Sequence, residues 1–162
     1  MKKIIVAIIV MAALCTAAFG GNVDAGRIEI GGYASMSKST AQNSDFQVNL
    51  NPFAMFYLAP SFAVGGSVGF WSSSNKDHSN SAISIGPRLA YYFDIGNPTL
   101  YPYIAGGFYW TSDHRNTISI PLEGGIRIFL NDFVALDPGL ILNFGDGVTD
   151  MTIKAGFSMF LR

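Results

Sequence analysis

The chain has 162 residues, of which 14% are aromatic and only 13% are charged, and its formal net charge is −1. This length fits one domain, and the near-neutral charge argues against a nucleic-acid-binding protein. The sequence contains no metal-ligand spacing and no glycine-rich phosphate loop, so we expect neither a metal nor another cofactor.

The first twenty residues have the layout of a secretory signal peptide. Lys2 and Lys3 precede an apolar run over residues 4–14, and small residues follow this run. A membrane-spanning helix needs ~20 apolar residues, so the run is too short to span a bilayer. We therefore predict a cleaved signal peptide over residues 1–20 and a single domain over residues 21–162.

The single cysteine, Cys15, lies inside this predicted signal peptide. Lipidation of Cys15 is the alternative interpretation, but the bulky Leu14 stands where a lipoprotein signal favours a small residue. Cleavage after residue 20 would leave a mature chain without cysteine, and so without disulfides.

Eight segments of the remaining chain alternate between apolar and mixed positions, with the period of two that indicates a β-strand. In the sixth, Ile118, Ile120 and Leu122 alternate with Ser119 and with a position occupied by proline. One face of every segment is free of charged residues and of Ser, Thr, Asn and Gln. In chain order the segments cover residues 28–36, 46–58, 62–70, 83–93, 100–110, 118–130, 134–144 and 151–161.

The opposite face of these segments decides between two architectures. A soluble sandwich or lipocalin-like barrel would turn this face to water and would need many charges on it. The face is instead rich in Gly, Tyr and other uncharged residues, which is typical of a filled barrel lumen. Its few charged residues are Arg27, Glu29, Arg88, Glu123, Arg127, Asp137 and Lys154.

Segment length and loop length agree with a membrane barrel. A tilted strand needs about 9–11 residues to cross a bilayer, and short turns alternate with long loops in bacterial barrels. The longer connections cover residues 37–45, 72–82, 111–117 and 145–150, and the shorter ones cover 59–61, 94–99 and 131–133. The sequence therefore predicts an all-β fold, an eight-stranded antiparallel up-and-down transmembrane β-barrel with a filled lumen.

Five prolines lie inside the predicted strands. Proline has no N–H group to donate to a neighbouring strand, and a closed barrel has no edge strand on which this loss would be harmless. Some of them should mark bulges or strand starts, whereas the pattern offers no reason for Pro52 or Pro87. The five are Pro52, Pro87, Pro102, Pro121 and Pro138.

Three stretches, residues 51–71, 99–110 and 154–162, carry a likeness to a known family. With them, the chain resembles the small eight-stranded outer-membrane barrels of the OmpA/OmpX type. This resemblance implies a monomer in the outer membrane of a Gram-negative bacterium, surrounded by membrane lipids. It also implies that the barrel-assembly machinery reads a C-terminal signal made of Lys154, Gly156, Met159 and Leu161.

An eight-stranded barrel is just wide enough for side chains to fill it, so we expect no open pore. The inward charges could line a gated ion path or form an ion-paired plug, and we favour the plug because buried charges must pair. If Leu130 faces Val134 across the short turn, Arg127 lies opposite Asp137. We predict that ion pair, and a second one between Glu123 and Arg88 across the lumen.

A structural or surface-interaction role, without enzyme activity, is the predicted function. The alternative is an enzyme that modifies lipid A, since some barrels of this size use histidine near the outer rim. Such an enzyme would need His78 or His114 to activate a hydroxyl within hydrogen-bond reach. Neither spacing matches a known motif, so we interpret Asp77, His78, Ser79, Asp113 and His114 as solvated loop residues.

Overall fold

A computed structural model describes residues 23–38, 46–74, 79–112, 117–145 and 148–161. The predicted signal peptide, including Cys15, lies outside the described residues. The strands are β1 (Ile28–Lys38), β2 (Phe46–Ala59), β3 (Phe62–Ser74), β4 (Ser79–Tyr92), β5 (Leu100–Gly107), β6 (Tyr109–Ser112), β7 (Thr117–Asn131), β8 (Val134–Leu136), β9 (Gly139–Gly145) and β10 (Val148–Leu161).

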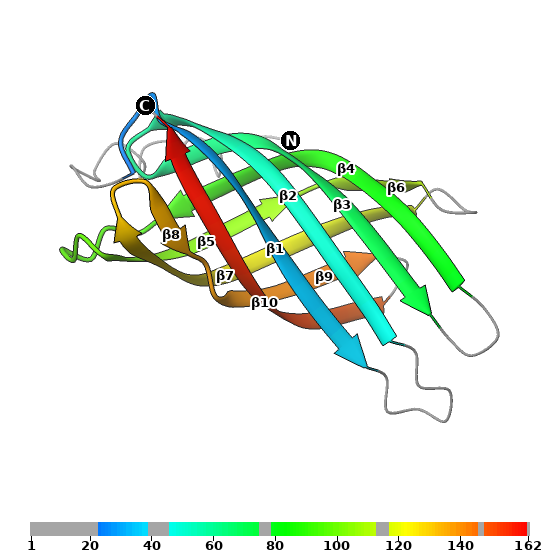
Figure 1. The fold of residues 1–162 in the computed structure, drawn as a ribbon. Helices are drawn as coiled ribbons and strands as arrows, with labels where there is room; N and C mark the ends of the chain where they lie inside the picture. Colours follow the sequence, from blue (N-terminus) through cyan, green and yellow to red (C-terminus); the bar gives the residue numbers. More distant parts are fainter. Residues whose placement is uncertain (1–22, 39–45, 75–78, 113–116, 146–147, 162) are drawn as a thin grey trace.

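These strands form one closed antiparallel barrel (Figure 1). Strands β5 and β6 follow each other along the same wall position between β4 and β7, and β8 and β9 do so between β7 and β10. Pairing of β1 with β10 closes the sheet. The ten elements therefore build an eight-stranded barrel, and the predicted fold class is confirmed.

The two faces of each strand point as the sequence indicates. Large apolar side chains such as Ile104, Ile120 and Leu140 stand on the outer surface, each about half exposed. Tyr57 and Tyr92, on the opposite faces of their strands, are almost fully buried in the lumen. The apolar faces of the strands therefore form the outer surface of the barrel, and the side chains of the opposite faces fill its lumen. Among the described residues, no helix is long and apolar enough to cross a membrane.

Two of the five prolines, Pro87 of β4 and Pro121 of β7, lie on neighbouring strands opposite the break between β5 and β6. On one side of the break, the ladder with β4 stops at Arg88 and resumes at Ile85, so that Pro87 falls in the gap. On the other side, the ladder with β7 skips Pro121. A residue without an N–H cannot complete a ladder, so the barrel places both prolines where the ladder is interrupted anyway.

The other three prolines follow the same rule. Pro138 lies in the break between β8 and β9, where its carbonyl accepts a hydrogen bond from Ile126 N at 3.1 Å. Pro102 lies opposite Phe93, just past the end of β4, and accepts a hydrogen bond from Phe93 N. Pro52 lies where the ladder between β2 and β3 is interrupted.

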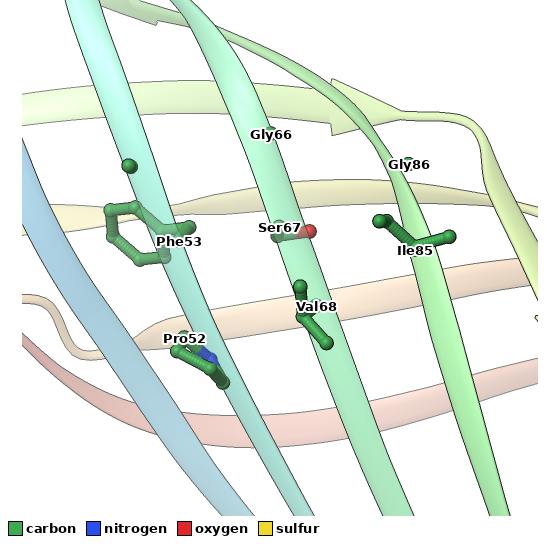
Figure 2. Close-up of a pocket in the computed structure, with 8 residues that line it drawn as sticks. Pro52, Phe53, Gly66, Ser67, Val68, Ile85 and Gly86 are labelled. Carbon is green, nitrogen blue, oxygen red and sulfur yellow. The ribbon is translucent and has the colours of Figure 1, made fainter.

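A shallow apolar groove accompanies the interruption at Pro52 (Figure 2). It lies across β2, β3 and β4, and small residues such as Gly66 and Gly86 line it. Val68 and Ile85, on the lipid-facing side, form another part of its wall. Its lining also includes Phe53 and Ser67, whose side chains are buried on the lumen face.

Three details of the predicted connections are wrong. The expected loop over residues 72–82 is largely strand, because β3 and β4 stay paired as far as Ser74 and Ser79. The expected loop over residues 145–150 is largely strand too, because β9 and β10 stay paired as far as Gly145 and Val148. Outside the hydrocarbon, polar residues can continue a hydrogen-bonded ladder. The apolar alternation used to predict the strands ends there, so it does not detect these parts of the strands. Also, Val134 pairs with Asn131 and not with Leu130.

The tighter turn between β7 and β8 explains why Val134 pairs with Asn131. The Asn131 side chain accepts a hydrogen bond from Phe133 N at 2.9 Å, which forms an Asx turn. A bulge between Phe129 and Asn131 absorbs the change, and Phe129 pairs with Ala135. The predicted register therefore holds from this point along β7.

Candidate functional site

The seven charged residues expected in the lumen are all buried there. None of them is more than 7% exposed, although they come from β1, β4, β7 and β10, from the residue before β1 and from the break between β8 and β9. These residues are Arg27, Glu29, Arg88, Glu123, Arg127, Asp137 and Lys154.

Arg127 of β7 holds the first cluster together. Its Nε donates to Asp137 Oδ1 at 2.6 Å, so the structure contains the ion pair that the sequence register predicts. The Nη2 atom of Arg127 lies 3.1 Å from Asp137 Oδ2 and 2.5 Å from Glu29 Oε1. Its Nη1 donates to Glu29 Oε2 at 2.9 Å. One guanidinium therefore binds two carboxylates.

Hydroxyl groups complete this first cluster. The Tyr57 hydroxyl donates to Glu29 Oε2 at 2.8 Å and accepts from Arg127 Nη1. Ser158 Oγ lies 2.8 Å from Glu29 Oε1 and 2.6 Å from Asp137 Oδ2, so it can donate its single proton to either carboxylate, and it accepts from Arg127 Nη2 at 3.2 Å. Such partners satisfy the lone pairs that an ion pair alone leaves open in a dry interior.

Glu123 of β7 is the centre of the second cluster. The guanidinium of Arg88 in β4 binds both of its carboxylate oxygens, one of them at 2.9 Å. Lys154 Nζ of β10 lies 2.5 Å from Glu123 Oε2. The expected Arg88–Glu123 pair is therefore present, and Lys154 is its third member.

Taken together, the two clusters are electrically balanced. Their cations are Arg88, Arg127 and Lys154, and their carboxylates are Glu29, Glu123 and Asp137. The first cluster has an excess of one carboxylate, and the second has an excess of one cation. Because the excesses are opposite, the centre of the lumen has no net formal charge.

Aromatic rings enclose these cations. The guanidinium of Arg127 lies 4.3 Å from the Tyr92 ring centroid, and that of Arg88 lies 4.8 Å from the Phe53 centroid. Lys154 Nζ is 4.8 Å from the ring of Tyr33. These distances fit cation–π attraction, which strengthens where water is excluded. Charges and rings together fill the central cross-section of the barrel.

Two buried polar atoms in the described lumen have no hydrogen-bond partner: Arg88 Nε and the Tyr103 hydroxyl. The hydroxyl lies close to the paired glycines of β7 and β9. A Cβ atom on Gly125 would stand 2.9 Å from it, and one on Gly139 would stand 3.1 Å from it. The same Cβ atoms would stand even closer to backbone carbonyl oxygens, that on Gly125 to Pro138 O and that on Gly139 to Gly124 O at 2.6 Å. Glycine at these two positions therefore allows both the close approach of the two strands and the position of the Tyr103 hydroxyl.

Arg27 lies apart from the two clusters, beside the turn between β7 and β8. Its Nη2 donates to the backbone carbonyl of Asp132 at 2.9 Å, and its guanidinium lies 5.6 Å from the Phe160 ring centroid. Arg27 is thus placed at the short-turn end of the lumen.

The four residues of the predicted assembly signal occupy both faces of β10. Lys154 and Gly156 face the lumen, whereas Met159 and Leu161 stand on the exposed outer face. Their recognition by the assembly machinery stays a prediction. His78 and His114 lie outside the described residues, and the described part of the chain contains no group of residues that could hold a metal ion.

The lumen changes character toward the loop ends of the strands. Lumen-facing side chains there are partly exposed and uncharged, and most of them carry a hydroxyl or an amide. We call this set the outer lumen. Its members are Asn49, Asn51, Trp71, Ser84, Thr111, Thr117, Ser119, Asn143 and Thr152.

Sequence reasoning missed the role of Ser158 and treated Tyr57 only as a space-filling residue. The period of β10 places Ser158 on the lumen face, two positions from Gly156 and from Phe160. The sequence pattern alone therefore indicates that Ser158 faces the lumen. It does not reveal that Ser158 meets Glu29, because that contact depends on how β10 closes against β1.

Comparison with models of known families finds no match to this sequence, and comparison with curated proteins finds none either. Several solved structures are similar. The N-terminal β-barrel domain of Pseudomonas aeruginosa OprF gives a TM-score of 0.61 at 12% identity, over 85% of this chain and 98% of that one.

Neisserial surface protein A gives a TM-score of 0.60 at 18% identity, over 83% of this chain and 97% of the other. The Yersinia pestis outer membrane protein Ail gives 0.55 at 16% identity, over 84% and 99%. Each match extends over nearly the whole of the other barrel. The chain has the fold of the small eight-stranded outer-membrane β-barrels.

Proposed function

We propose that this protein is an outer-membrane barrel with a structural or surface-interaction role, and that its lumen is a permanent plug. The observation that carries this proposal is the balanced lumen, in which Arg127 and Glu123 each bind two partners of opposite charge. Ions passing through would have to displace side chains that are almost fully buried and tightly hydrogen-bonded.

The outer surface supports a place in a membrane. Exposed Ile, Leu and Phe side chains surround the barrel. In water these side chains would form an apolar patch far larger than those on soluble monomers. The similar structures are outer-membrane proteins of Gram-negative bacteria, and the N-terminal segment reads as an export signal. Lipids are therefore the constant partners, the barrel-assembly machinery is the transient one, and the protein acts as a monomer.

A purified sample in planar lipid bilayers tests the plug. We expect no steady conductance above that of protein-free membranes. Replacing Arg88, Glu123, Arg127 and Glu29 together with alanine should produce measurable conductance. This variant removes the ion pairs of both clusters and leaves one carboxylate, Asp137, and one cation, Lys154, so the net formal charge of the lumen centre does not change. A sustained open channel in the unmodified protein would contradict the plug.

Fractionation and gel mobility test the membrane assignment. The protein should be recovered with the outer membrane, and unboiled samples should migrate differently from boiled ones because the closed barrel stays folded in cold detergent. Recovery as a periplasmic monomer that is soluble without detergent would exclude the membrane barrel.

Enzyme activity is not part of the proposal. The carboxylates of the described lumen bind cations and the hydroxyls of Tyr57 and Ser158, but both hydroxyls are fully buried, so a substrate in the membrane has no access to them. Mass spectrometry of lipid A from cells with and without the gene tests this point. We expect identical acyl patterns, and a pattern altered by the gene would require the enzyme alternative.

A further inference from the structure

The ladder that closes the barrel stops about halfway along its two strands. Pairing of β1 with β10 runs from Ile28 and Leu161 to Ala34 and Ala155. Beyond that point residues 35–38 of β1 pair with β2 only, and residues 148–154 of β10 pair with β9 only, among the residues that the structure describes. The outer part of β10 passes behind β1 in Figure 1. We call these two unpaired edges the open seam.

An open seam needs a partner in a membrane. In antiparallel sheets every second residue directs its N–H and C=O toward the neighbouring strand. Hydrocarbon offers these groups no hydrogen bonds, and open sheet edges are not found facing it. The seam must therefore close on itself or bind something that supplies donors and acceptors.

The two sides of the seam differ in chemistry. On the outer face, Met151 and Ile153 are 70% and 75% exposed, more than any other large apolar side chain of the described barrel. On the inner face, the partly exposed Thr152 and Asn143 of the outer lumen carry a hydroxyl and an amide. The charged neighbour, Lys154, is bound to Glu123. The seam thus joins an apolar exterior to a polar interior, in which the described charge, that of Lys154, is already paired.

We propose that the open seam binds a glycolipid from the leaflet around the loop ends. Sugar hydroxyls, which both donate and accept, hydrogen-bond the unpaired edges of β1 and β10 together with Thr152. The acyl chains pack outside against Met151 and Ile153. A simple anion fits less well, since Lys154 is already paired. An inserted peptide strand fits less well too, because β1 and β10 are antiparallel and it would have to run parallel to one of them.

Amide hydrogen exchange in lipid vesicles tests the proposal directly. The protein is compared in phosphatidylcholine vesicles, in the same vesicles with lipopolysaccharide lacking O-antigen, and in the same vesicles with phosphatidylglycerol. Every second amide within residues 35–38 and 148–154 points into the seam. We expect these amides to exchange roughly tenfold more slowly with lipopolysaccharide at ten times its dissociation constant. Amides of residues 29–34, within the paired part of β1, serve as the control and should not change.

Each other outcome overturns the proposal. Protection in phosphatidylcholine alone would show that the seam closes without a ligand. Absence of protection in all three membranes would show that no glycolipid binds there. Equal protection by phosphatidylglycerol would show that a glycerol hydroxyl suffices and that the site does not select sugars.

A variant pair provides a second, independent test. Thr152→Val removes one hydroxyl beside the seam and keeps the side-chain shape, whereas Thr111→Val makes the same change on β6, on the other side of the barrel. Loss of one hydrogen bond should weaken retention of the lipopolysaccharide in native mass spectrometry by about fivefold for Thr152→Val only. Equal retention by both variants would place the lipid elsewhere.

Discussion

Replacing Arg127 with methionine is expected to destabilise the folded barrel by about 3–5 kcal/mol. The Arg127 side chain is 2% exposed and binds both Glu29 and Asp137. Methionine fills a similar space without charge, so the variant leaves two carboxylates buried beside each other. Urea unfolding in lipid vesicles measures the loss.

A double-mutant cycle with Asp137→Leu separates the energy of the Arg127–Asp137 ion pair from the loss of side-chain packing. Removing both partners should cost less than the two single losses combined, with a coupling energy well above 0.5 kcal/mol, since the two residues share hydrogen bonds. Asp132→Leu in the exposed turn is the matched control and should stay within about 0.5 kcal/mol of the parent. Additive losses would mean that Arg127 and Asp137 do not act as partners.

Placing arginine on the outer face at mid-strand is the second change with a large expected effect. Ile104 lies in β5 and is 48% exposed among neighbours that are also apolar. Ile104→Arg should lower the free energy of unfolding by about 2–4 kcal/mol, the cost of this side chain near the bilayer midplane. Urea titration in vesicles, together with the yield of inserted protein, gives the measurement.

Ile95→Arg is the matched control for this substitution. Ile95 is 57% exposed, but it lies in the turn between β4 and β5, beyond the ends of both strands. Near the interface the same substitution should cost about 0–1 kcal/mol. Equal losses for the two variants would mean that Ile104 does not face lipid.

Strand positions and faces could be predicted because the period of two is a local property of the sequence. It fixes which side of the sheet Tyr57 or Ile120 occupies, whatever the neighbouring strands do. The breaks at Phe108 and at Pro138 could not be predicted in the same way. The position at which a ladder stops depends on the register of a strand with both neighbouring strands. The sequence pattern shows only that each proline needs an interruption of the ladder beside it.

The lumen network was predictable only in part, for a related reason. Arg127 and Asp137 flank one short turn, so the hairpin register alone sets them opposite each other. Glu29 reaches the same guanidinium from β1, and Ser158 reaches it from β10. Those contacts depend on the closure and the width of the barrel, which hairpin reasoning does not include. The bulge at Asn131 also required the side-chain hydrogen bond that forms the turn.

The placement of the charged partners on distant strands has a consequence for folding. Glu29 and Arg127 are 98 residues apart in the chain, and Glu29 and Ser158 are 129 apart. A single strand that entered the bilayer alone would carry its charge into hydrocarbon unneutralised, at a cost of several kcal/mol. The β7–β9 hairpin neutralises Arg127 with Asp137, but Glu29, Arg88 and Lys154 have their charged partners outside their own hairpins. Neutralisation is complete only when the first and last strands meet. Insertion and barrel closure are therefore coupled into one cooperative step, and this step is intrinsically slow because it depends on long-range contacts.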